Sequence, residues 1–235
     1  MHKVSVPAET LEYIRVRRGK VHLYDTLDPA KTALVVIDMQ DTFVSPEQPA
    51  YVPYARGIVP NINRLAEALR RSGGTVVWVI TTFDDKTLDA WGNFFNIFYT
   101  PERRAMLHGA LRDGASGHRL WHEMDRQADD WTVVKDRFSC FIQGSSDIEA
   151  RLRKAGIDTV LITGTLTNVC CESSARDAMM RNFKVVMVSD GNAAATDAEH
   201  SATLSIMMKN FADVMTADEV IIRFAAQSAK AAAGD

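Results

Sequence analysis

Residues 33–38 read ALVVID, a continuous apolar run that is rich in β-branched residues and ends at a carboxylate. A strand buried on one face alternates apolar and polar residues, but this run does not alternate. It is typical of a strand buried on both faces, as in a parallel sheet. Four further runs have the same character, at residues 75–81 (TVVWVIT), 132–135 (TVVK), 159–163 (TVLIT) and 184–189 (KVVMVS).

Helical patterns separate these runs. Residues 58–71 carry apolar side chains at helical spacing, residues 146–154 begin near Ser-Ser-Asp, and glycines follow both segments. Further helices are expected over residues 168–181 and 198–209, and from about residue 216 after a weak last strand at 213–215. The alternation predicts an α/β fold, with a doubly wound, mostly parallel six-stranded sheet and helices on both faces.

The chain has 235 residues, of which 46% are hydrophobic, so it is long enough for one large core. No repeat and no linker divides it. This predicts a single domain over residues 1–235, with an N-terminal extension of about residues 1–30 and a long excursion of about residues 83–131. The excursion carries aromatic residues between Trp91 and Tyr99. Such an excursion is often a lid or an interface, and an extra helix packing an aromatic stripe on the body is at least as compatible.

Composition argues against several classes of partner. The 27 basic residues nearly balance the 30 acidic ones, for a net charge of −3, so nothing supports a nucleic-acid partner. No window is apolar enough for a membrane span, and the first twenty residues lack the apolar centre of a signal peptide. Three cysteines, an odd number, make a disulfide framework unexpected. We therefore expect a soluble cytoplasmic protein with free thiols and no membrane partner.

Three chemically useful side chains follow strands in this pattern. Asp38 ends the first strand, Lys135 ends the third, and Cys170 follows the fourth across a short turn. Adjacent parallel strands would bring these residues to one edge of the sheet, where open α/β sheets bind ligands. Cys170 also falls in the opening turn of a helix, which favours a thiolate. The set suffices for acyl transfer from an amide, although three unrelated strand-end residues would give the same pattern.

Three ordered motifs carry a family resemblance. They are ALVVIDMQDTF (residues 33–43), VVKDRFSCF (133–141) and LITGTLTNVCCESSARDA (161–178). With these motifs the chain resembles the isochorismatase-like cysteine hydrolases from about Lys31 to Val220. That family includes nicotinamidases, N-carbamoylsarcosine amidohydrolases, ureidoacrylate amidohydrolases and biuret hydrolases.

The resemblance implies a role for each motif residue. Cys170 would attack the amide carbonyl, Asp38 would accept its proton and later protonate the leaving amine, and Lys135 would hold both in place. A cis peptide bond is typical of the family in the turn before the cysteine, here at Thr165–Leu166. The backbone N–H groups of Leu166 and Cys170 would then form the oxyanion hole. Isochorismatases proper lack the cysteine, so its presence favours an amide or ureide substrate.

Four residues are candidates for binding the substrate. Gln40 and Phe43 follow Asp38 closely and would line or support the pocket, as similar residues do in relatives. Trp91 and Phe138 are weaker candidates, because an aromatic residue can equally belong to the core. By resemblance we also expect a homo-oligomer, a dimer or a tetramer.

Neighbouring residues offer competing interpretations. Cys171 stands where the family usually has valine, which favours packing over catalysis, and Cys140 is expected to be a small buried side chain. His118 and His122 are spaced for one helix face, but without the glutamate of a zincin motif they are better explained by a solvated face. The histidine of the helix after Asp190, His200, matches a structural histidine of the family.

The sequence lacks the metal motif of one branch of the family and carries charged residues near its own motifs. Nicotinamidases carry an Asp-x-His-x-x-x-His metal site after the second strand, whereas residues 83–95 read FDDKTLDAWGNFF. We therefore expect no metal, no other cofactor and no nicotinamidase activity. Charged residues near the motifs would brace the site, or else supply an arginine that binds a carboxylate: Arg137, Glu172, Arg176 and Asp177.

The leading hypothesis is a metal-independent cysteine amidohydrolase acting on a small linear amide, a ureido or carbamoyl compound being favoured, through a thioester. One alternative is a hydrolase of another small amide or of an N-carbamoyl amino acid. Another is a non-catalytic scaffold or partner protein, with the aromatic excursion as an interface. An intact Asp38, Lys135 and Cys170 set argues for the enzyme, because a binding module does not need it.

Overall fold

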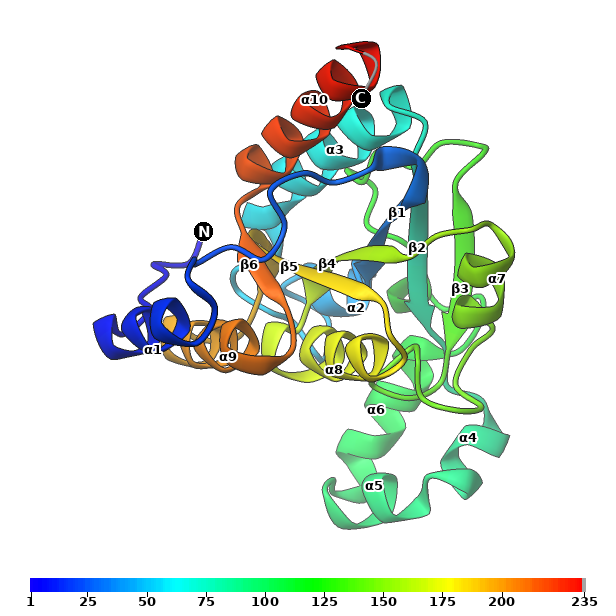
Figure 1. Ribbon diagram of the computed structural model, residues 1–235. Coiled ribbons are helices and arrows are strands. Elements are labelled where there is room, and N and C mark those ends of the chain that lie inside the picture. Colours follow the sequence, from blue (N-terminus) through cyan, green and yellow to red (C-terminus); the bar gives the residue numbers. More distant parts are fainter. Residues whose placement is uncertain (234–235) are drawn as a thin grey trace.

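The six strands are all parallel and lie in the order β3-β2-β1-β4-β5-β6 (Figure 1). This computed structural model describes residues 1–233. The order reverses between β1 and β4, which is the switch point of a doubly wound sheet. The predicted α/β fold is therefore confirmed. The strands are β1 (Thr32–Ile37), β2 (Thr75–Thr81), β3 (Trp131–Lys135), β4 (Thr159–Thr165), β5 (Lys184–Ala193) and β6 (Asp213–Met215).

Helices cover both faces of the sheet, so the central strands have no solvent-facing side. One face packs against α3 (Ala55–Arg71) and α10 (Ala217–Ala233). The other face packs against α7 (Ile148–Lys154), α8 (Glu172–Met180) and α9 (Asp197–Asn210). All six residues of β1 are buried, which explains why its sequence is uniformly apolar rather than alternating.

The N-terminal segment packs against the body of the domain. Its helix α1 (Ala8–Arg18) lies beside α9 and buries Ile14 in the hydrophobic core between the sheet and helices α7, α8 and α9. A short 3₁₀ turn, Pro29–Lys31, then leads into β1. Within the described residues, no helix is long and apolar enough to cross a membrane.

The excursion after β2 holds three short helices that extend away from the sheet (Figure 1). They are α4 (Asp85–Ala90), α5 (Gly92–Ile97) and α6 (Pro101–Leu111), followed by a 3₁₀ turn at Ser116–His118. Phe95 is completely buried and packs edge-on against Phe83, and both belong to the hydrophobic core on the α3 face of the sheet. A separate short helix, α2 (Asp41–Val44), follows β1.

Gly164 in β4 fixes how closely the two central strands approach. It pairs with Ile37 and has a φ of +112°, which glycine adopts without strain. A β-carbon added at Gly164 would lie 1.9 Å from the Ile37 carbonyl oxygen. Only glycine therefore allows β4 to end beside β1 at the site described below.

Candidate active site

An ion pair between Asp38 and Lys135 lies at the carboxyl ends of two strands. Lys135 is the last residue of β3 and Asp38 directly follows β1. The Lys135 Nζ donates to Asp38 Oδ2 at 2.9 Å, and the side chains are 1% and 0% exposed. Burial lowers the pKa of Lys135, but its acidic neighbours, with the Asp38 carboxylate first among them, together raise it above its ordinary value. Lys135 is therefore a fixed cation at this edge of the sheet.

Thr81, the last residue of β2, joins the two charged groups. Its Oγ1 donates to Asp38 Oδ1 at 2.8 Å and accepts from Lys135 Nζ at 2.5 Å. Lys135 Nζ also donates to the Arg137 carbonyl at 3.1 Å, so all three ammonium protons have acceptors. The sequence analysis missed Thr81, although it ends its strand as Lys135 does and could have been found by that position.

Cys170 lies in one π-helical turn, Thr167–Cys171, which runs directly into α8. The sequence predicted a continuous helix from residue 168, and the π turn is the difference. The Cys170 side chain lines the same cavity as Lys135 and Thr81. Asp38 accepts hydrogen bonds from Lys135 and Thr81, which both line this cavity. The structure thus brings Asp38, Lys135 and Cys170 to one edge of the sheet.

The expectation of a thiolate favoured by its surroundings is wrong for the free protein. Burial raises the pKa of the Cys170 thiol well above its ordinary value; Lys135 lowers it, but the Asp38 carboxylate raises it again. A buried thiolate would have to lose its hydration, and the attraction of the Lys135 ammonium does not compensate for that loss. Burial therefore favours the neutral thiol of Cys170.

The turn before the cysteine has the expected backbone conformation. The Thr165–Leu166 peptide bond is cis, as the family resemblance implied. Thr165 Oγ1 donates to the Asp38 carbonyl at 2.8 Å, which ties this turn to the residue after β1. The Leu166 carbonyl accepts from the N–H groups of Val169 and Cys171, each at 3.1 Å. An oxyanion hole at Leu166 and Cys170 remains a prediction.

A cavity of about 280 Å³ opens beside Cys170. Phe43 and Phe138, two of the four predicted pocket residues, line it. The excursion supplies part of the wall through α5, α6 and the residues between them. Arg137 also lines it and was predicted only as an alternative, an arginine that binds a carboxylate. The remaining lining residues were not predicted as pocket residues: Ala50, Thr81, Phe83, Phe94, Tyr99, Leu107, Leu111, Leu166 and Val169.

The other two predicted pocket residues do not line this cavity. Gln40 is completely buried, and its side-chain amide bonds to the backbone of Thr81 in both directions, at 3.0 and 2.8 Å. It therefore supports the end of β2 instead of contacting a ligand. Trp91 stacks on Phe94 and meets Phe138 edge-on, with ring centroids 4.2 and 4.9 Å apart. It thus lies behind the cavity wall.

Arg137 lies in different surroundings from the other charged residues near the motifs. It lines the cavity, its guanidinium lies 5.1 Å above the Trp91 ring, and it pairs with Asp136 at 3.2 Å. Glu172 and Arg176 instead pair with each other at 2.6 Å along α8. The single bracing network that the sequence favoured is therefore not formed, because Arg137 points to a different environment.

The three cysteines have different surroundings. Cys171 is completely buried, and its thiol donates to the Thr163 carbonyl at 3.8 Å, so it packs behind the turn as predicted. Cys140 is buried beside Ser174, and burial raises the pKa of its thiol to about 12. Of the three, only Cys170 lines the cavity beside Lys135.

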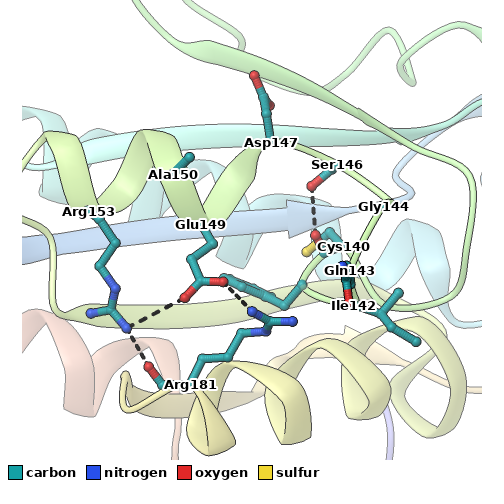
Figure 2. A pocket seen from close by; sticks show the side chains of 11 residues that line it. Cys140, Ile142, Gln143, Gly144, Ser146, Asp147, Glu149, Ala150, Arg153 and Arg181 are labelled. Atoms are coloured by element: carbon teal, nitrogen blue, oxygen red, sulfur yellow. Dashed lines mark hydrogen bonds and ion pairs between the residues drawn. The ribbon is translucent and has the colours of Figure 1, made fainter.

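A second hollow, of about 540 Å³, lies over α7 and the loop before it (Figure 2). Three of its charged residues pair with one another: Glu149 lies between Arg153 and Arg181, and Arg181 Nη1 approaches Glu149 Oε2 at 2.6 Å. Ser146 Oγ donates to the Cys140 carbonyl at 2.6 Å on the other side. Neither Asp38 nor Lys135 lines this hollow, so it is not the candidate site.

The two histidines spaced for one helix face lie in different environments. His118 ends a 3₁₀ turn and its Nε2 lies 2.7 Å from Thr82 Oγ1, whereas His122 is exposed and lies outside any helix. The predicted solvated helix face is therefore wrong for His118. Asp84, after β2, caps α4 by accepting from Thr87. With no histidine in residues 83–95, the donor set here does not fit the metal site of nicotinamidases.

Comparison with known proteins agrees with this geometry. The family model of the isochorismatase domain, built from sequences, matches residues 32–219 of this chain. A ureidoacrylate amidohydrolase, RutB of Klebsiella variicola, is 31% identical over 179 residues, which cover 70% of this chain and 74% of that protein. A probable inactive nicotinamidase of Arabidopsis thaliana is 32% identical over 184 residues, covering 76% of this chain and 88% of that protein.

Solved structures give the same assignment. A cysteine hydrolase from Pseudomonas syringae superposes with a TM-score of 0.75 at 27% identity, covering 88% of this chain and 97% of that one. An N-carbamoylsarcosine amidase from Thermoplasma acidophilum superposes with a TM-score of 0.63 at 28% identity, covering 80% and 97%. The family match spans most of the chain, including all six strands and the Asp38, Lys135 and Cys170 motifs. The protein therefore belongs to the isochorismatase family of hydrolases.

Proposed function

We propose that this hydrolase is a cysteine amidohydrolase that cleaves a small linear amide through a thioester on Cys170. The observation that carries the proposal is the position of Cys170 in one cavity with Lys135, whose ammonium binds the Asp38 carboxylate at 2.9 Å. A nucleophile, a base and a fixed cation are the groups that amide cleavage requires.

The reaction would start from the neutral thiol. Cys170 Sγ attacks the carbonyl carbon while its proton passes to Asp38, so the thiolate forms only as the new S–C bond forms. We assign the N–H groups of Leu166 and Cys170 to the developing oxyanion. The C–N bond then breaks as Asp38 returns the proton to the leaving ammonia or amine. Water, activated by the same carboxylate, hydrolyses the thioester and restores the thiol.

Lys135 and Thr81 would keep Asp38 in its reactive state. Each carboxylate oxygen of Asp38 accepts one hydrogen bond, from Thr81 Oγ1 at 2.8 Å and from Lys135 Nζ at 2.9 Å. The two bonds fix the orientation of the carboxylate, and the lysine ammonium balances its charge. Proximity of this fixed base to the thiol is therefore the main source of catalysis that we propose.

Two classes of substrate have support. The similarity to a ureidoacrylate amidohydrolase and an N-carbamoylsarcosine amidase supports a ureido or carbamoyl compound. The aromatic and aliphatic side chains of the cavity wall support the second class, a simple amide without further polar groups.

An ammonia-release assay tests the proposal. Ureides, carbamoyl amino acids and simple amides would be offered to the wild type, to Cys170→Ala and to the matched control Cys171→Ala. Release by the wild type and the control, but not by Cys170→Ala, is the expected result. Equal release by Cys170→Ala would remove Cys170 as the nucleophile. Silence across the panel, with Cys170 also inert to iodoacetamide up to alkaline pH, would favour a non-catalytic scaffold.

A further inference from the structure

The wall of the cavity beside Cys170 distinguishes between the two substrate classes. We infer that the substrate is an amide whose acyl group is apolar, a short branched alkyl chain or a single ring, and not a ureide. The inference rests on the proposed amidohydrolase function and specifies the substrate of that same site.

Most of the wall is apolar. Nine of the fourteen lining residues are alanine, valine, leucine or phenylalanine. They come from separate parts of the chain, with Phe43 in α2, Phe94 and Leu111 in the excursion, and Val169 in the nucleophile turn. An acyl group attached to the reacting carbonyl would therefore contact carbon atoms on several sides.

Three polar side chains of the wall, Lys135, Thr81 and Arg137, already have partners, and the Tyr99 hydroxyl is a further polar group there. All three protons of Lys135 Nζ are donated within the protein, and Thr81 Oγ1 bonds to both Asp38 and Lys135. The Arg137 guanidinium donates to the Asp136 carbonyl at 2.9 Å and lies over the Trp91 ring. These groups are donors or are already bonded, so they add few hydrogen-bond acceptors to the cavity.

Several backbone acceptors in the wall are occupied as well. Leu166 O accepts two N–H groups and Thr81 O accepts the Gln40 amide. The carbonyls of Phe43, Phe94, Leu111, Lys135 and Arg137 also accept a hydrogen bond from within the protein. A ligand that carries extra N–H groups would find few free acceptors here.

A ureide carries such an N–H group. In R–NH–CO–NH₂ the nitrogen on the acyl side of the carbonyl replaces the carbon of R–CH₂–CO–NH₂. Buried without an acceptor, that N–H loses its hydrogen bond to water and gains none, whereas a CH₂ gains from leaving water. We expect the exchange to weaken binding by about tenfold or more.

The size of the cavity agrees with this substrate. An apolar cavity of about 150 Å³ lined by leucine, isoleucine and phenylalanine holds a benzene molecule in another protein. The present cavity of about 280 Å³ therefore has room for a ring or a branched chain together with the amide group.

Two matched pairs of compounds test the inference. Isovaleramide and isopropylurea differ only by CH₂ against NH, as do phenylacetamide and phenylurea. Binding is measured as protection of Cys170 from iodoacetamide, which is independent of the lower reactivity of ureas, and turnover as ammonia release. We expect both amides to protect at concentrations at least tenfold lower than their ureas and to be hydrolysed to the acid and ammonia.

A pair of variants tests the role of the wall. Val169→Thr places a hydroxyl in the cavity with little change in shape. It is expected to weaken protection by the amides at least fivefold. It should also reduce the difference in protective concentration between each amide and its urea. Val134→Thr makes the same exchange on β3 at an exposed position outside the cavity, and it should behave as the wild type.

The outcomes distinguish failure of the apolar-substrate inference from failure of the proposed amidohydrolase function. Ammonia release from the ureas, together with protection equal to or better than that by the amides, would overturn the apolar substrate and leave the amidohydrolase function standing. No release from any of the four compounds, with no protection of Cys170 by either amide, would overturn the apolar substrate. If Cys170 is also dispensable in the wider ammonia-release assay, the proposed function falls with it.

Discussion

The imidazole rings of His2 and His200 stack with their centroids 4.2 Å apart and their planes 12° apart. The other face of His2 stacks on Tyr54, and its Nε2 accepts the Ala194 N–H at 3.0 Å. His200 Nδ1 in turn lies 2.8 Å from Thr167 Oγ1, in the π turn that carries Cys170. The first residues of the chain are therefore connected to the candidate active site through two stacked rings.

His200 makes stability depend on pH in a defined window. Burial lowers the pKa of His200 to about 4, from an ordinary value of 6.5. Between these values the unfolded chain binds a proton that the folded protein excludes, so stability falls as the pH falls from about 6.5 towards 4. His200→Gln keeps a group that can bond to Thr167 but does not titrate.

We expect the free energy of unfolding to decline less for His200→Gln than for the wild type, by roughly 3 kcal/mol over this window. Urea denaturation at a series of pH values measures it. Parallel pH profiles for the two proteins would contradict the prediction.

The two adjacent cysteines should respond very differently to the same substitution. Cys170→Ala removes the side chain in the cavity and should reduce amide hydrolysis by at least about a thousandfold while the fold is kept. Cys171→Ala empties a small volume in the core and should cost about 1 kcal/mol of stability with little change in activity. Steady-state kinetics and thermal denaturation of both variants measure this, and the reverse pattern would exchange the roles of the two thiols.

Thr81→Val keeps the shape of the side chain and removes the hydroxyl between Asp38 and Lys135. One carboxylate oxygen and one ammonium proton then lack a partner, at about 1–3 kcal/mol for an unsatisfied buried group. We expect kcat/KM to fall by about 10- to 100-fold.

Thr87→Val is the matched control for Thr81→Val. It removes a buried hydroxyl that bonds to Asp84 outside the site, and it should change stability without that loss of activity. Equal activity losses in the two variants would point to a general structural effect.

The raised pKa of Cys170 predicts how the free enzyme reacts with alkylating agents. Because burial keeps the thiol protonated, its rate of reaction with iodoacetamide should still rise with pH at pH 9, the ordinary pKa of a thiol. Mass spectrometry assigns the label to each of the three cysteines, and the protein unfolded in urea gives the profile of unperturbed thiols. A plateau near neutral pH would mean that the free enzyme holds a thiolate.

Gly164→Ala should prevent the two central strands from meeting. The new β-carbon would lie 1.9 Å from a backbone oxygen of Ile37, which cannot move aside as a flexible side chain could. We expect a loss of more than about 4 kcal/mol, or failure to fold. Gly109→Ala, in α6 with open space around it, should leave the fold intact. Comparable melting temperatures for both variants would refute the clash.

Strands that have a local pattern of apolar residues could be predicted from the sequence. Continuous apolar runs predicted five strands to within a few residues, and the weak sixth run at 213–215 is β6. The positions of Asp38, Lys135 and Cys170 followed from the strand ends, because parallel strands bring those ends to one edge.

The cavity wall could not be predicted, because it depends on distant contacts. Phe94 and Tyr99 reach the cavity only through the three-dimensional placement of the excursion beside Cys170, and no local pattern specifies that arrangement. The state of Cys170 was mispredicted for a similar reason. The sequence shows a nearby helix start and a lysine, whereas burial by the rest of the chain decides the pKa of the thiol.

The excursion supplies Phe94, Tyr99 and Leu111 to the wall, whereas Asp38 and Lys135 stand at the ends of strands in the sheet. The reacting groups and the side chains that select the substrate are consequently supplied by different parts of the chain. Mutations in α5 and α6 can accumulate over generations and redirect the enzyme to new compounds while the reaction itself is retained. The same separation makes residues 92–111 the natural region to randomise in directed evolution, with the strand ends left untouched.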